Sequence, residues 1–110
     1  MAAIQLQQGE RLIGQGMMAY WEPVWGHSCD TCSGTVFVTT QRVCFCLSML
    51  HSVEFELALS EIRGFATGRH LFFTKVVLYD WSGKTFTLTG FPVKKLQGWL
   101  KQAGVQKIGE

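Results

Sequence analysis

The sequence predicts a mainly β protein, a bent barrel of seven strands capped by one C-terminal α-helix. Alternation of apolar and polar residues dominates residues 10–90, which is typical of strands. After Pro92 the apolar residues recur at spacings of three and four instead. The 110 residues suffice for one domain and fall short of two. A run of short strands cannot leave its faces and edges open to water, so we expect it to close or to be capped.

The first predicted strand covers residues 10–21, ERLIGQGMMAYW. Gly14 and Gly16 interrupt its apolar pattern, and they indicate a bend or a bulge. Pro23, the glycines and the small polar residues that follow predict a loop up to residue 34.

Six further strands follow, of which residues 34–40, GTVFVTT, are rich in β-branched and aromatic side chains. In residues 53–59 the apolar side chains share one parity, whereas Glu54 and Glu56 share the other, so one face is buried. Residues 81–84, WSGK, predict a turn. The six segments are 34–40, 42–48, 53–59, 62–68, 70–80 and 84–90.

The predicted helix runs from about Pro92 to Ala103, and Gly104 is placed to end it in the left-handed conformation. One apolar stripe along it would pack on the sheet and plug the barrel. The stripe comprises Val93, Leu96, Trp99, Leu100 and Ala103. We therefore expect residues 1–110 to form a single domain with a core of about 9–104.

The charge of the chain argues against nucleic acid as a partner. Ten basic and eight acidic residues give a net charge of +2, and only Lys94, Lys95 and Lys101 form a close cluster. Nucleic-acid binders usually carry a denser basic stripe. The first residues lack the pattern of a signal peptide, and no apolar run is long enough to span a membrane. The sequence thus predicts a cytoplasmic protein.

Residues 34–45, GTVFVTTQRVCF, resemble the signature of GRAM domains and related bacterial pleckstrin-homology-like domains. That signature places a tight turn between two strands and an arginine directly after it, here Arg42. Residues 55–62, FELALSEI, are similar to the next element of the family, and the turn at 80–84 and the final helix lie where the family has them. The resemblance covers roughly residues 9–104.

This resemblance implies a bent seven-stranded barrel capped by a helix, and a module that binds membrane lipids or protein segments rather than an enzyme. Phosphoinositide-binding members carry Lys and Arg near the end of the first strand and on the second, where they bind phosphates. Residues 17–41 contain neither Lys nor Arg. The family's inositol-phosphate pocket is therefore not assigned to this chain.

Aromatic and apolar residues stand instead at the end of the first strand and in the loop after it. Such side chains suit a membrane interface or a protein contact, although they also suit the cover of one barrel end. The lysines of the helix would lie on its wet face, where they would meet anionic lipid. The predicted contact residues are Tyr20, Trp21, Val24, Trp25, Lys94 and Lys95.

The four cysteines leave a metal site open as an alternative. Cys29 and Cys32 have the C-x-x-C spacing of half a zinc site, and the other ligands would be Cys44 and Cys46, or His27 with one cysteine. On a flat strand Cys44 and Cys46 share one face about 7 Å apart, too far for an ordinary disulfide. Free cysteine also serves as a small apolar residue, and this use is favoured over zinc.

The sequence therefore predicts a non-catalytic binding module without a cofactor, because no acid–base or nucleophile set converges in it. Peripheral association with membrane lipid is the leading function. The alternative is a protein partner or a homo-oligomer, through an edge strand or through the face of Cys44 and Cys46. A metal-binding protein is the third.

Overall fold

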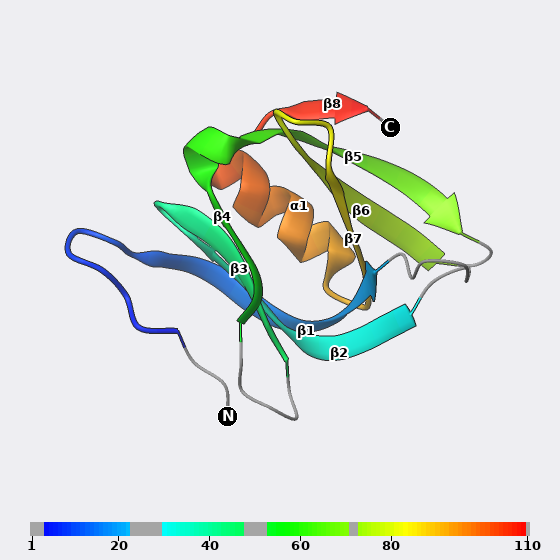
Figure 1. The fold of residues 1–110 in the computed structure, drawn as a ribbon, viewed down its shortest axis with the longest axis horizontal. Coiled ribbons are helices and arrows are strands. Elements are labelled where there is room, and N and C mark those ends of the chain that lie inside the picture. Colours follow the sequence, from blue (N-terminus) through cyan, green and yellow to red (C-terminus); the bar gives the residue numbers. More distant parts are fainter. Residues whose placement is uncertain (1–3, 23–29, 48–52, 71–72, 110) are drawn as a thin grey trace.

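The computed structural model describes residues 4–22, 30–47, 53–70 and 73–109. One bent sheet, almost entirely antiparallel, holds a single long helix against it, which confirms the predicted fold class (Figure 1). The elements are β1 (Leu12–Glu22), β2 (Asp30–Thr39), β3 (Arg42–Leu47), β4 (Val53–Ala58), the short 3-10 helix η1 (Leu59–Glu61), β5 (Ile62–His70), β6 (Phe73–Asp80), β7 (Thr85–Thr89), α1 (Val93–Gln102) and β8 (Lys107–Gly109).

The strands are hydrogen-bonded in the order β4-β3-β2-β1-β7-β6-β5-β8, so hydrogen bonds do not close the sheet into a ring. The sheet bends until β4 faces β7 across the core, where the rings of Phe55 and Phe86 lie 4.8 Å apart. Aromatic side chains thus fill the space between the edge strand β4 and the interior strand β7.

Two local predictions were wrong. β2 begins at Asp30 and pairs with β1 from its first residue, so Cys32 lies in a strand opposite Tyr20 and not in a loop. The structure also has an eighth strand, β8, which runs parallel to β5. Three residues are too few to show an alternating pattern, and β8 is an exposed edge without one.

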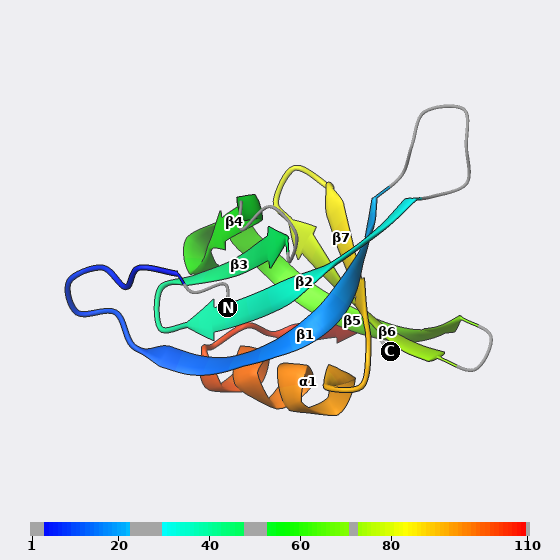
Figure 2. The ribbon, with the colours of Figure 1, turned by 90° about the horizontal axis from the view of Figure 1, so that it is seen from below.

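Helix α1 packs across β1 at two glycines of that strand (Figure 2). A Cβ atom on Gly14 would lie 2.1 Å from the indole ring of Trp99, and one on Gly16 would lie 3.0 Å from Pro92. The bulge predicted near Gly14 is present between Leu12 and Gly14. These glycines therefore let the helix approach the sheet. The helix ends at Gln102, and Gly104 follows it in the left-handed conformation with φ 94°, as predicted.

The core contains an aromatic cluster in which Tyr20 packs against Phe45, Phe55 and Phe86. From the helix, the apolar stripe contributes fully buried Leu96 and Leu100. The remaining buried members are Met18, Val36, Val38, Val43, Leu57, Ile62, Phe65, Val76, Leu78, Leu88, Val93 and Val105.

Candidate functional site

The connection between β7 and α1 lies against the middle of β1. A Cβ atom on Gly90 would lie 3.3 Å from the Cα of Met18, and the position of a Cβ on Gly16 lies 3.0 Å from Pro92. Residues 90 and 92 thus contact residues 18 and 16, which places Phe91 alongside Met17. Gly90 is needed here because it has no side chain to separate the two segments.

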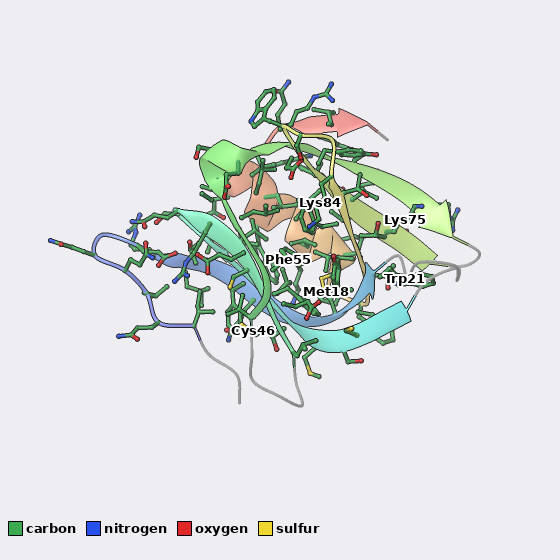
Figure 3. The ribbon with its side chains drawn as sticks, viewed as in Figure 1. Met18, Trp21, Cys46, Phe55, Lys75 and Lys84 are labelled. Atoms are coloured by element: carbon green, nitrogen blue, oxygen red, sulfur yellow. The ribbon has the colours of Figure 1, made fainter. Side chains whose placement is uncertain are left out.

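Phe91 and Met17 are the large apolar side chains that this contact leaves in solvent. Phe91 is fully exposed, at 106% of its reference area, and Met17 is 70% exposed. In contrast, the neighbouring Met18 points into the core (Figure 3). Single exposed apolar residues are common, but two adjacent ones at a strand and a helix start form a small apolar projection.

Basic residues lie on the strand and the helix next to this projection. Lys94 and Lys95 are the second and third residues of α1, and both are exposed. Lys75 of β6 pairs with Thr89 at the end of β7, so its backbone lies next to the same connection, and its partly exposed side chain extends along Gly68 of β5 (Figure 3). We call Met17, Lys75, Phe91, Lys94 and Lys95 the Phe91 surface.

The two helix lysines are not placed there for helix stability. The N-terminus of a helix carries partial positive charge, so a lysine in the first turn is unfavourable by about 0.3–1 kcal/mol. The first turn of α1 contains no acidic residue, and Pro92 before it makes no side-chain cap. Residues that oppose the helix dipole suggest a requirement other than folding.

The acidic side chains that the structure describes are engaged or lie elsewhere. Asp80, at the far end of β6 from Lys75, accepts the backbone N–H groups of Ser82 and Lys84 within its own turn. A hydrogen bond from the Ser82 hydroxyl, together with these backbone bonds, holds the pKa of Asp80 below its usual value. Glu61 accepts the N–H of Ala58 next to β5. Positive charge at the Phe91 surface is therefore not neutralised by these groups.

Two predicted contact residues lie at the end of β1. Trp21 is partly buried, and its indole Nε1 donates a hydrogen bond of 2.9 Å to Thr89 Oγ1, so it adjoins the Phe91 surface and braces β1 against β7. Tyr20 is only 4% exposed and packs in the aromatic cluster, so its assignment as a contact residue is corrected. Val24 and Trp25 lie outside the described residues.

The open side of the sheet carries one lysine close to the aromatic cluster. Lys84 Nζ lies 5.2 Å from the ring centroid of Phe86, a cation–π contact (Figure 3). This lysine is exposed, but it follows the β6–β7 turn at the other end of β7 from Phe91. It therefore does not belong to the Phe91 surface.

The cysteines of β3 are structural. Cys44 and Cys46 share the outer face of the sheet, as their parity predicted, and form a small buried cluster with Phe37 that Ile4 covers. Burial raises the pKa of the Cys44 thiol to about 12 and also raises that of Cys46. The chain itself therefore buries these two side chains, and an oligomer contact through the rest of this face stays a prediction.

Only three of the five predicted metal ligands, Cys32, Cys44 and Cys46, lie among the described residues. Within the described residues, no group of three or more His, Cys, Asp or Glu side chains gathers closely enough to hold a metal ion. Cys32 is partly buried on β2 and packs against the main core. It therefore lies on the opposite face of the sheet from the cluster of Cys44 and Cys46. His27 and Cys29 lie outside the described residues, so zinc binding through them stays a prediction.

Arg42, the arginine of the resemblance, holds the N-terminal segment to the sheet. Its Nε donates to Glu10 Oε2 at 2.8 Å, and its Nη2 donates to the carbonyl of Gln5 at 2.7 Å. Thr39 Oγ1 donates to the same Glu10 carboxylate, and Glu56 lies 3.2 Å from Arg42 Nη1. The hydrogen bond from Arg42 lowers the pKa of Glu10 to about 2. This network supports the fold, and it does not supply a free cation.

Sequence reasoning missed Phe91 and Met17. The sequence pattern places Phe91 between the last predicted strand and the helix and assigns it no role. Its position between Gly90 and Pro92, outside the helical stripe, was the signal that it does not face the core. Met17 has the opposite parity from buried Met18 and Tyr20 in β1, which also predicts an outward side chain.

The fold is similar to those of solved pleckstrin-homology domains. The Vps36 N-terminal PH domain matches with a TM-score of 0.71 at 16% identity, covering 91% of this chain and 83% of that chain. The human PH domain of pleckstrin homology domain-containing protein family A member 5 matches with a TM-score of 0.60 at 10% identity, covering 98% and 89%. Identities this low show the fold alone.

A third solved structure, the C-terminal domain of an unknown protein from Leishmania infantum, matches with a TM-score of 0.67 at 18% identity, covering 87% of this chain and 86% of that chain. Neither a protein-family model nor a curated protein matches the sequence. None of the helices in the described part of the chain has the length and apolar character needed to cross a bilayer.

Proposed function

We propose that this pleckstrin-homology-like chain is a non-catalytic, GRAM-type binding module that associates peripherally with membranes through the Phe91 surface. The observation that carries the proposal is the fully exposed Phe91 beside Met17, with lysines on the adjoining strand and helix. Pleckstrin-homology-like domains are generally binding modules, which supports a non-catalytic role. At the predicted cytoplasmic location, the surface would meet a leaflet rich in anionic lipid.

The chemistry of the surface suits a shallow contact with the bilayer. Phe91 and Met17 would enter the boundary between headgroups and acyl chains, and each apolar side chain removed from water contributes about 1.5–3 kcal/mol. Lys75, Lys94 and Lys95 would remain among the headgroups, where each contributes about 1 kcal/mol toward an anionic surface. Binding also costs free energy because the protein loses translational and rotational freedom. The net result should be weak and reversible association.

The same chemistry favours anionic lipid in general over one inositol phosphate. A stereospecific phosphate pocket needs several convergent Lys or Arg donors, and residues 17–41 contain none. The basic residues of the Phe91 surface instead lie on one strand and one helix, around an apolar centre. We therefore expect binding to depend on surface charge and on salt.

The test is co-sedimentation of the intact chain with vesicles of phosphatidylcholine alone and with added phosphatidylserine. We expect binding only to the anionic vesicles, with a loss of about tenfold or more for Phe91→Ala. The matched control is Trp81→Ala, because Trp81 is an equally large side chain, 69% exposed, in the turn at the other end of β7. Trp25→Ala, in the loop predicted from the sequence, is also expected to weaken binding.

A protein partner remains the second candidate, and the edge position of β4 favours it. β4 is the end strand of the sheet order, so one side of its backbone lacks a partner strand among the described residues. An extended segment of another chain would add there as a further strand. Failure to bind vesicles of any composition, together with elution as a dimer or higher oligomer, would reject membrane association in favour of this function.

A further inference from the structure

Met17 and Met18 are neighbours in β1 with opposite environments. Met17 is 70% exposed on the outer face of the sheet, whereas Met18 is 4% exposed and packs in the core. A soluble oxidant therefore reaches the thioether of Met17 and is excluded from that of Met18. The exposed thioether is also half of the apolar centre of the Phe91 surface, because residues 17 and 91 lie side by side.

We propose that Met17 is an oxidation site that regulates attachment to the membrane, an inference that rests on the proposed function. Hydrogen peroxide transfers one oxygen atom to the Met17 sulfur. The sulfur lone pair forms the new S–O bond as the O–O bond breaks, and the proton of the transferred hydroxyl passes to the departing hydroxide. Sulfur is oxidised by two electrons, and the peroxide is reduced to water.

Methionine sulfoxide at residue 17 would bind the membrane less well than the thioether does. A sulfoxide is polar and accepts hydrogen bonds, so its entry into the boundary with the acyl chains costs free energy. Phe91 and the lysines are unchanged by this step and would continue to give weak binding. The expected effect of oxidation is thus a loss of about tenfold in vesicle affinity, comparable to the removal of one apolar anchor.

The described thiols compete poorly for the oxidant. Cys44 and Cys46 are buried, and the raised pKa of both leaves almost no thiolate at neutral pH. Dithiothreitol reverses the sulfenic acids and disulfides that any cysteine forms, but it does not reduce methionine sulfoxide at a useful rate, which requires methionine sulfoxide reductase. Recovery with dithiothreitol would therefore indicate cysteine oxidation, and recovery only with methionine sulfoxide reductase would indicate methionine oxidation.

The experiment treats the intact chain with hydrogen peroxide, then with dithiothreitol, and measures co-sedimentation with phosphatidylserine-containing vesicles. Peptide mass analysis should find one added oxygen on Met17 and none on Met18. We expect affinity to fall about tenfold, to stay low after dithiothreitol and to recover after methionine sulfoxide reductase.

Two variants make the result specific to one sulfur atom. Met17→Leu has an apolar side chain of similar size without sulfur, so the vesicle affinity of this variant, whatever its starting value, should not change on treatment with peroxide. Met18→Leu should remain as sensitive to peroxide as the native chain. An equal loss of binding in oxidised Met17→Leu would overturn the inference.

The failure of this inference is distinguishable from the failure of the proposed function. If the untreated chain binds anionic vesicles and complete oxidation of Met17 leaves that binding unchanged, only the oxidation site is rejected. If the untreated chain binds no vesicle of any composition, membrane association and its regulation are both rejected.

Discussion

The chain covers one of two apolar clusters on the outer surface of the sheet and leaves the other exposed to solvent. On β2 and β3, Phe37, Cys44 and Cys46 are covered by Ile4 of the N-terminal segment. On β1 and the β7–α1 connection, Met17 and Phe91 stay in solvent. The charged residues beside each cluster follow the same division, because Arg42 is paired with Glu10, whereas Lys94 and Lys95 have exposed side chains at a helix end that disfavours them.

This difference separates stability from function within one fold. A covered cluster with a paired cation contributes to folding, and its side chains are unavailable to a partner. An uncovered cluster with lysines around it contributes little to folding, and its apolar area is available to a surface that can remove it from water. We therefore expect substitutions beside the covered cluster to lower stability and leave vesicle binding unchanged. Substitutions in the exposed cluster should lower vesicle binding with little loss of stability.

The largest expected effect is the loss of stability on removal of Arg42. Arg42→Ala leaves the carboxylate of Glu10, whose side chain is 0% exposed, buried without its partner. Breaking a buried pair in this way costs about 3–4 kcal/mol, measured by urea denaturation at neutral pH. Vesicle binding at a temperature where the variant is folded should be unchanged.

The matched control for Arg42→Ala is Arg63→Ala. Arg63 is an exposed arginine of β5, and its removal should change the free energy of unfolding by less than about 0.5 kcal/mol. Equal effects of the two substitutions would mean that the N-terminal segment is not held by the Arg42 network, and the contrast between the two clusters would fail.

A somewhat smaller effect is expected from acid. The folded pKa of Glu10 is about 2, below its ordinary value of 4.5. A lowered folded pKa contributes stability that is complete above pH 4.5 and is lost as the pH falls from there toward 2. The difference corresponds to about 2–3 kcal/mol in urea midpoints measured across that range.

Glu10→Gln assigns this dependence on pH to one carboxyl group. The amide does not titrate, so the variant should be less stable than the native chain at pH 6 and should lose less stability between pH 4.5 and 2. A slope identical to that of the native chain would show that another group is responsible.

Much of the fold could be predicted because it depends on patterns that a single sequence contains. The parity of Val43 and Phe45 against Cys44 and Cys46 separated the core face of β3 from its outer face. The change of period after Pro92 located α1 to within one residue at each end. The glycine pair of β1 indicated the bulge, although its second role, room for Trp99, depends on the tertiary contact.

The candidate site was harder to predict, since it depends on which apolar residues the fold leaves uncovered. Tyr20 was expected at the surface because it is amphipathic and near a loop, but its parity with Met18 places it in the core. The nearness of Met17 and Phe91, 74 positions apart in the sequence, follows only from the packing of Gly90 and Pro92 on β1. Likewise, nothing local to Ile4 shows that it covers the cysteines.

In the last and smallest of these effects, stability and vesicle binding are expected to change in opposite directions. Lys94→Glu places a negative charge in the first turn of α1, which should stabilise the helix by about 0.5–1 kcal/mol, while vesicle binding falls about tenfold or more. Lys101→Glu, in the last turn, should destabilise the helix by a similar amount and affect vesicle binding less. Thermal unfolding and co-sedimentation of both variants would measure the two quantities. A Lys94→Glu chain that is more stable and yet binds anionic vesicles as well as the native chain would remove the lysines from the Phe91 surface, and leave the apolar pair alone to explain binding.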